Sequence, residues 1–317
     1  MRGTNRGAAL LMAMLTAAIV ASLAATAIWR YSNMVAVESA QRQRAQMAWL
    51  LQGALDWARL ILIEDAKANK RDAADHLDEP WAMPLKEARL STFLAAQQEA
   101  AADGVTDQAF LSGAIRDGQS RFNLTNLQRD QGLSEKDVDI FMALCDRVGV
   151  NTTPWLDAFE RYRADRQLGA PTFRWVIQRL EDWHWWGVPL ESIRAMAEFV
   201  DVLPQRTPIN VNTASAVVLE AAWPGLSPAQ AQSIVAQRQV KPFTNLNDVR
   251  SVAPDLAFDT QQFSTTSQYF WVTGQLRLSS TTATESTLLK RDNLKVSVVR
   301  RERQSGFARP VDTPVFE

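Results

Sequence analysis

Few residues of this sequence could carry out chemistry. Among its 317 residues are one cysteine, Cys145, and two histidines, His76 and His184. A nucleophilic cysteine needs a neighbouring base. Cys145 instead lies in the apolar stretch IFMALCDRV, which predicts a small buried side chain, and His76 lies in DAADHLDEP, which predicts a solvated loop. No HExxH, CxxC, GxSxG, P-loop or GxGxxG motif occurs in a usable context. We therefore predict no catalytic residue and no enzyme activity.

An aromatic cluster and the overall charge are the next features that bear on binding. The stretch EDWHWW, with a cluster from Trp183 to Trp186, would suit a carbohydrate or protein platform, but adjacent tryptophans more often alternate between core and rim. We expect the second arrangement. The net charge of −1 does not favour a nucleic-acid-coating protein, because phosphate binding depends on accumulated Lys and Arg.

The elements that must position such residues begin with an apolar segment. From Ala8 to Trp29 the chain has no charged residue, and a segment of this length is long enough to span a bilayer as a helix. A cleaved export signal is the alternative, with Ala25-Thr26-Ala27 as its cleavage site. Basic residues flank the segment on both sides, so the positive-inside rule does not set its orientation.

The residues after this segment predict that the helix continues. No proline occurs before Ala66, and Gly53 is the one glycine after the apolar segment, so a helix of about 85 Å is expected from Ala8 to Ala66. Apolar residues recur at steps of three and four, which predicts that one stripe of the helix packs on a soluble domain. That stripe comprises Met47, Leu50, Ala54, Trp57 and Ile61.

The start of the chain resembles a type IV pilin-like protein. A short basic leader ends at Gly7 and is followed directly by the long apolar helix. The resemblance implies that a prepilin peptidase cuts between Gly7 and Ala8 and methylates the new amine of Ala8. Most relatives carry Glu at the fifth mature position, where this chain has Met12. That departure is usual in the K-class minor pseudopilins of the type II secretion system. Because the Glu is thought to neutralise the terminal amine of a neighbouring subunit, its absence suits a subunit at the tip.

A second resemblance lies at 208–250, PINVNTASAVVLEAAWPGLSPAQAQSIVAQRQVKPFTNLNDVR, which is similar to a helix-hairpin-helix unit. Thr213 or Asn212 is the expected N-cap of its first helix, and Ser227 followed by Pro228 that of the second. Its basic residues are too few for phosphate binding: Arg238, Lys241 and Arg250 stand against Glu220 and Asp248. We expect a packing module without nucleic acid.

An earlier segment, RFNLTNLQRDQGLSEKDVDIFMALCDRVG, repeats the order of features in a degenerate form. This pair of segments, INVNTA above all, is what K-class pseudopilins look like. Helical patterns fill 126–257, whereas SQYFWVTGQLRLSS and TLLKRDNLKVSVVRRER alternate as antiparallel strands. AFLSGAIRDGQSRFNL is expected to form a hairpin of the same sheet, turning at Asp117-Gly118.

The expected fold is therefore α+β: a pilin-like long N-terminal helix packed on an antiparallel sheet, with a large all-α domain of helix-hairpin-helix or SAM-like units inserted. The expected boundaries are a leader at 1–7, a transmembrane half-helix at 8–29, the first part of the pilin domain at 30–125, the inserted all-α domain at 126–257 and the C-terminal strands at 258–317.

The resemblance also implies a function and a location. It implies a minor pseudopilin that caps the tip of the periplasmic pseudopilus and helps to start its assembly and protein export, anchored by a single pass in the inner membrane. Implied partners are other minor pseudopilins in a hetero-oligomeric tip complex, the prepilin peptidase, the inner membrane, and the secretin or a secreted substrate. The alternative is a membrane-anchored periplasmic helix-hairpin-helix protein of the DNA-uptake type.

K-class relatives bind calcium, although the resemblance requires no cofactor. This chain does not reproduce their acidic runs well. Asp157, Glu160 and Asp165, in PWLDAFERYRADRQLGAP, are weak candidate ligands because their spacing lacks the alternating oxygen ligands of a compact calcium loop.

Overall fold

The computed structural model describes residues 5–68, 74–92, 109–129, 132–167, 177–254, 259–278 and 281–307; the side chains of 5–7, 129, 166–167 and 304–307 are not among those described. The chain divides into two compact units, Met1–Gly53 and Ala54–Glu317.

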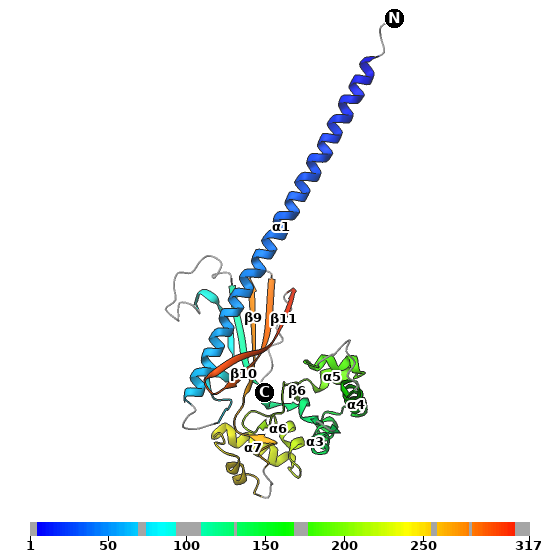
Figure 1. Ribbon diagram of the computed structural model, residues 1–317. Coiled ribbons are helices and arrows are strands. Elements are labelled where there is room, and N and C mark those ends of the chain that lie inside the picture. Colours follow the sequence, from blue (N-terminus) through cyan, green and yellow to red (C-terminus); the bar gives the residue numbers. More distant parts are fainter. Residues whose placement is uncertain are drawn as a thin grey trace. The chain divides into compact units, whose positions relative to one another are not determined.

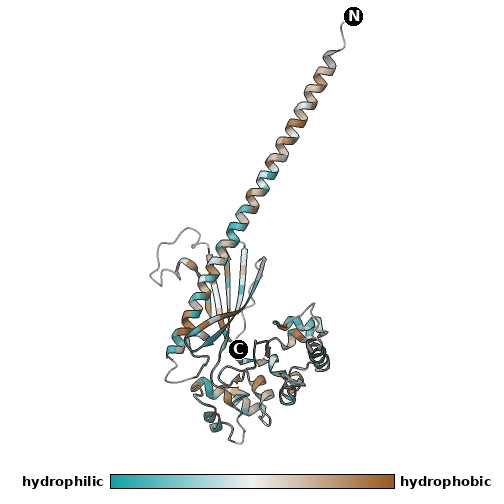
Figure 2. Ribbon diagram, viewed as in Figure 1, coloured by the Kyte–Doolittle hydropathy of each residue, from teal (hydrophilic) through white to brown (hydrophobic). Residues whose placement is uncertain are grey.

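The first unit is helical throughout its described residues and belongs to helix α1 (Asn5–Ala68). The large apolar side chains between Leu10 and Val37 are exposed, and Figure 2 shows the apolar first half of this helix. Among the described residues, α1 is the one helix long and apolar enough to cross a membrane. The helix runs on past residue 30 without a break, as the absence of proline predicts.

The second unit contains a five-stranded antiparallel sheet in the order β1-β2-β9-β10-β11 (Figure 1). Strand β2 is followed by β9 in the sheet, although about 150 residues of sequence separate them. Strands β9, β10 and β11 form the meander that the alternating sequence predicts. The strands are β1 (Leu85–Arg89), β2 (Ala109–Asp117), β9 (Tyr269–Leu278), β10 (Thr281–Asp292) and β11 (Lys295–Phe307).

The last four turns of α1 pack on one face of this sheet. Leu55, Ala58 and Leu62 are buried there in a cluster with Phe270 and Val272, which alternate along β9 with residues of the opposite face. The buried stripe is thus shifted by one residue from the predicted one: Ala54, Trp57 and Ile61 are only partly buried. Met47 of the predicted stripe is buried and Ile61 packs at the edge of the cluster, so the prediction was wrong in the register of the stripe. Either of two adjacent apolar stripes fits the spacing, and contact with the sheet decides between them.

The sheet's other face meets the inserted segment between β2 and β9. Tyr269 and Trp271 lie on that face in a small cluster with Leu203 of the insertion and Leu288. Phe270 and Val272 therefore face α1, whereas Tyr269 and Trp271 face the insertion, as the alternation of the sequence predicts.

The described part of the insertion is mainly helical and has a core of its own, which runs from Phe122 to Phe263. Its α-helices are α3 (Glu135–Val148), α4 (Thr153–Gln167), α5 (Leu190–Met196), α6 (Ala216–Ala222) and α7 (Pro228–Val240). Short 3-10 helices lie between them and near the sheet: η1 (Pro80–Ala82), η3 (Gly118–Ser120), η4 (Leu124–Leu127), η5 (Leu180–Trp186) and η6 (Leu246–Ser251). Two-residue strands complete it: β3 (Phe122–Asn123), β4 (Gln128–Arg129), β5 (Gly132–Leu133), β6 (Val200–Asp201), β7 (Ile209–Asn210) and β8 (Phe263–Ser264). The α+β class with a helical insertion is confirmed.

The predicted hairpin at Asp117-Gly118 is wrong. After β2 the chain enters η3, and the following strand β3 pairs in parallel with β6 of the insertion instead of returning along β2. Asp117 accepts a hydrogen bond from the Gln119 amide, so this Asp-Gly pair starts a 3-10 turn that leads the chain out of the sheet.

Candidate functional site

The predicted processing residues lie at the start of α1. Ala8 and Met12 are exposed on the apolar half of the helix, with 63% of Met12 accessible, and Gly7 is helical. Such a surface of apolar side chains is suited to a lipid environment or to contact with similar helices. The processing roles of Gly7 and Ala8, and the marker role of Met12, stay predictions.

The most specific motif of the sequence, INVNTA, joins the insertion to the sheet. Asn210 is fully buried, and its Nδ2 lies 3.0 Å from each of three acceptors: the Asp75 carbonyl, Asp117 Oδ2 and Ser267 Oγ. Its Oδ1 accepts from the amide of Asn212 at 2.9 Å. One side chain therefore holds together the two crossings between sheet and insertion, after β2 and before β9, and the loop that follows α1.

Asp117 is the acceptor at the centre of this joint. It is buried, and its carboxylate accepts from Asn210 Nδ2, from Thr213 Oγ1 at 2.6 Å and from Ser267 Oγ at 2.6 Å, besides the Gln119 amide at 2.7 Å. Burial raises the pKa of Asp117, and the hydrogen bonds from Ser267, Thr213, Gln119 and Asn210 oppose that rise. Sequence reasoning placed Asp117 in a turn and missed this role.

An ion-pair cluster lies next to the joint. Arg291 of β10 lies 2.6 Å from Asp65 at the end of α1 and also pairs with Asp75, whose Oδ2 accepts from the Ser267 amide at 2.6 Å. Glu79 completes a group of three buried carboxylates whose oxygens lie within 4.8 Å of one another. Burial is the main cause that raises the pKa of Asp65 to about 7 and that of Asp75 to about 6, against the lowering effect of Arg291. The arginine already supplies a cation to these carboxylates, so they do not indicate a metal site.

The degenerate repeat predicted from the sequence is visible in the backbone. Phe122-Asn123 pairs in parallel with β6, as Ile209-Asn210 pairs with β8. In each repeat a second asparagine then holds the backbone of one distant residue through both ends of its side-chain amide: Nδ2 donates a hydrogen bond and Oδ1 accepts one. Asn126 does so with the N–H and C=O of Thr207, and Asn212 with those of Phe243. The asparagines of FNLTN and INVNT therefore have equivalent structural roles.

The hairpin of α6 and α7 differs at one cap from the prediction. Ser215 caps α6 by accepting from the Val218 amide, so the prediction of Thr213 or Asn212 was wrong. Those two side chains are instead bonded to Asp117 and Phe243. Ser227 caps α7 with proline at its first position, as predicted. The turn between the helices passes through Gly225 at φ 85°, a conformation that favours glycine.

Arg238 is one of the three basic residues of 208–250, and its side chain does not lie on the surface of this segment. It is buried, and its Nη1 donates to the carbonyls of Val211 at 2.7 Å and Ala214 at 2.6 Å. Burial lowers the pKa of Arg238 to about 10. This arrangement leaves Lys241 and Arg250 as the basic residues of 208–250 outside the core, which further disfavours phosphate binding.

The tryptophan cluster alternates as predicted. Trp183 is buried, with its ring 4.2 Å from that of Phe159 between centroids, and Trp186 is half-buried against Tyr162. Trp185 is 78% exposed. One residue of the three thus presents an aromatic surface to solvent, which falls short of a platform.

The candidate calcium ligands occupy exposed positions along one helix. Asp157, Glu160 and Asp165 are all exposed on α4, and Glu160 is paired with Arg163. Asp165 lies eight positions after Asp157 along the helix, a rise of about 12 Å. Because calcium oxygens must lie within about 2.6 Å of one ion, these three residues do not fit a single site by themselves.

The cysteine and the two histidines, which the sequence offers as reactive residues, lie in a packed core or bond to nearby backbone groups. Cys145 is fully buried in the insertion core, and burial raises the pKa of its thiol to about 12. His76 accepts at Nδ1 from the Asp78 amide, and His184 Nδ1 lies 3.0 Å from the Val188 carbonyl. The two histidines and the cysteine are on separate elements, and no contact among them is observed within the described residues.

Comparison with known proteins gives three results. Residues 209–266, which contain INVNTA and the α6–α7 hairpin, match the family described as type II secretion system (T2SS), protein K. The chain is 27% identical over 333 residues to type II secretion system protein K of Pseudomonas aeruginosa, covering 96% of this chain and 95% of that protein. The fold matches a chain in the crystal structure of the GspK-GspI-GspJ complex from enterotoxigenic Escherichia coli, with a TM-score of 0.63 and 20% identity over 85% of this chain and 99% of that one.

The long apolar helix, the antiparallel sheet and the helical insertion between β2 and β9 define a pilin-like protein. INVNTA, whose Asn210 bonds to Asp117, lies inside the segment that matches protein K. The chain is similar to the protein K family, the K-class minor pseudopilins of the type II secretion system, in residues 209–266 and, through the Pseudomonas aeruginosa protein, over nearly its full length. Proteins of this family are structural components of a secretion system.

Proposed function

We propose that this minor pseudopilin caps the tip of the periplasmic pseudopilus and helps to start its assembly, and thereby protein export across the outer membrane. The observation that carries the proposal is the combination of Met12 on the apolar helix with an insertion of about 150 residues between neighbouring strands. Met12 cannot neutralise the amine of a neighbouring subunit. A subunit repeated in every layer would also have to accommodate its insertion in each of them.

The proposed path to the tip begins in the inner membrane. A prepilin peptidase cuts between Gly7 and Ala8 and methylates Ala8, and the apolar surface of α1 then moves from lipid to the helices of other pseudopilins. The globular residues lie in the periplasm, with the helix crossing the inner membrane once. The exposed apolar side chains from Leu10 to Val37 support both environments, because neither requires a buried polar group.

The proposed partners are the other minor pseudopilins. The similar structure from enterotoxigenic Escherichia coli is a complex named GspK-GspI-GspJ, and we infer that this chain forms a corresponding hetero-oligomer. The secretin or a secreted substrate would meet the insertion. Neither catalysis nor a cofactor is part of the proposed role, and a calcium role for Asp157, Glu160 or Asp165 would need further ligands.

The tip position is tested by counting copies. Pseudopili of different lengths, sheared from cells and separated by size, are analysed by quantitative mass spectrometry for this chain and for the major pseudopilin. A tip subunit gives a constant number of copies per filament, so its ratio to the major pseudopilin falls as length increases. A ratio that stays constant with length would show a repeating subunit and refute the tip proposal.

A further inference from the structure

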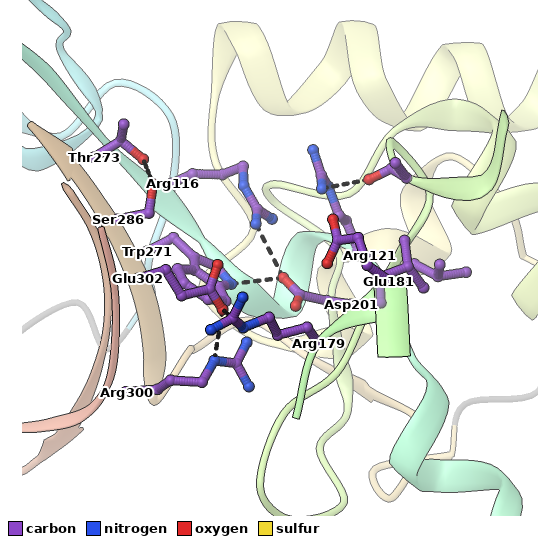
Figure 3. Close-up of a pocket in the computed structure, with 13 residues that line it drawn as sticks. Arg116, Arg121, Arg179, Glu181, Asp201, Trp271, Thr273, Ser286, Arg300 and Glu302 are labelled. Atoms are coloured by element: carbon purple, nitrogen blue, oxygen red, sulfur yellow. Dashed lines mark hydrogen bonds and ion pairs between the residues drawn. The ribbon is translucent and has the colours of Figure 1, made fainter. Parts of the chain in front are cut away.

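A polar cavity lies where the sheet meets the insertion within the second unit, and Figure 3 shows the residues around it. Its volume is about 240 Å³, several times the share of one water molecule. Four arginines line it: Arg116 from β2, Arg300 from β11, and Arg121 and Arg179 from the insertion. The protein therefore brings four guanidinium groups from distant parts of the sequence to one hollow.

The carboxylates of the cavity match only some of these charges. Asp201 lies 2.9 Å from Arg116, and Glu302 lies 2.9 Å from Arg300 and 3.6 Å from Arg179. Asp201 also accepts from the Trp271 indole at 2.7 Å and from the Val202 amide at 2.8 Å, so its two oxygens are already bonded. The third carboxylate of the lining, Glu181, is exposed. The lining thus holds four arginines and three carboxylates, and Glu198, outside the lining, also acts electrostatically on Arg121.

Arg121 is the arginine of this lining for which the described residues provide no direct ion pair. Its Nη1 donates to the Ala197 carbonyl at 2.6 Å, and among the described residues it forms no ion pair within 4.0 Å. Burial, and then the like charge of Arg116, lower the pKa of Arg121 to about 10, against the raising effects of Asp201 and Glu198. A guanidinium has five N–H donors in a fork that fits a carboxylate, and a neutral carbonyl satisfies only part of this capacity.

We propose that the cavity binds a single carboxylate group, which pairs with Arg121. A carboxylate carries one negative charge and fits the fork of the guanidinium that lacks a direct ion pair, whereas a phosphate dianion would bring a second negative charge near Asp201 and Glu302. Both small carboxylates and the acidic side chain of another protein offer this chemistry. The cavity is lined by both the sheet and the insertion, so an occupant would touch both.

The test uses the full-length protein in detergent micelles, with ¹⁵N-labelled tryptophan. The indole N–H of Trp271 bonds to Asp201 in the cavity and reports binding by NMR. Four probes are titrated: sodium acetate, the blocked tripeptide Gly-Glu-Gly, its Gly-Gln-Gly counterpart and inorganic phosphate. Acetate or the glutamate peptide should shift the signal in a saturable way, and the glutamine peptide should not. The tighter of the two binders distinguishes a small molecule from a protein side chain as the source.

Variants locate the site. R121Q should weaken carboxylate binding at least about tenfold, and R121K, which keeps the charge and folds if R121Q does not, should retain weaker binding. R277Q, which removes an arginine paired with Glu87 outside the cavity, is the matched control and should bind normally. No saturable shift with either carboxylate, equal binding of the glutamine peptide, tighter binding of phosphate, or unchanged binding by the Arg121 variants would overturn the proposal.

Discussion

Asp117 and Asn210 are buried polar side chains that connect three parts of the chain. The chain leaves the sheet after β2 and returns to it at β9, and both of these crossings lie next to this pair of residues. Both side chains are polar and buried, so each needs hydrogen-bond partners to be stable there. The most specific motif of the sequence is therefore explained by the geometry of the insertion.

The first prediction concerns the carboxylate of this joint. Asp117→Asn places an amide N–H₂ among donors from Thr213 and Ser267, so donors would face donors. We expect a loss of about 2 kcal/mol or more in the free energy of unfolding. The measurement is urea denaturation followed by tryptophan fluorescence. Asp78→Asn, at an exposed turn, is the control and should change stability little; equal stability of both variants would refute the role of Asp117.

The second prediction concerns Arg238. Arg238→Met keeps much of the apolar stem but leaves the carbonyls of Val211 and Ala214 without these donors. The unfolding free energy should fall by about 1 to 3 kcal/mol. Arg194→Met, at an exposed position in the last turn of α5, is the matched control. A smaller loss for Arg238→Met than for the control would contradict the structural role assigned to this guanidinium.

Helix α1 shows at the scale of elements what its sequence can and cannot predict. Its length follows from composition, because no proline interrupts it. Its buried stripe does not, because apolar residues occupy adjacent faces. Likewise the Asp-Gly pair at 117–118 fits a hairpin, but the partner of β3 lies about 80 residues away in β6. Local patterns predicted the types of most elements, whereas long-range contacts determined which face is buried and which strands pair.

The third prediction compares two leucines on α1. Leu62 is fully buried against the sheet, and Leu60 is 57% exposed. Leu62→Ala should lower the unfolding free energy by about 2 to 5 kcal/mol through lost burial and a cavity, and Leu60→Ala by much less. Denaturant unfolding of the two variants decides the question. A larger effect at Leu60 would mean that the helix presents a different face to the sheet.

The fourth prediction concerns pH and the contact of α1 with β10. Because the pKa values of Asp65 and Asp75 are raised on folding, to about 7 and about 6, the folded protein binds protons that the unfolded chain does not bind between about pH 4 and pH 7. Their contribution to stability is therefore greater at low pH and is lost as the pH rises through this window. The melting temperature should therefore rise by a few degrees when the pH is lowered from about 8 to about 5.5.

Asp65→Asn removes one of these titrating groups and should make the melting temperature depend less on pH. Glu64→Gln, at the exposed neighbouring position, is the control and should leave the dependence unchanged. If the Asp65 variant has the wild-type pH dependence, the ion-pair cluster around Arg291 is not its source.

The whole molecule combines features that are separate in the sequence. The apolar helix, the sheet and the helical insertion were predictable because each has its own periodicity, and INVNTA connected them to the protein K family. The joint at Asp117 and the arginine cavity were not predictable, because their members come from elements far apart in the sequence. Only folding brings such side chains together, and no local pattern marks them in advance.

The central claim is that this chain is processed and used as a pseudopilin, and the mature N-terminus tests it most directly. The full-length protein is produced in cells with and without prepilin peptidase and analysed by mass spectrometry. We predict a terminus at N-methylated Ala8 in the first case and an uncut leader in the second. A terminus just after Ala25-Thr26-Ala27, or the same terminus in both cells, would contradict the account and indicate an ordinary exported or anchored protein.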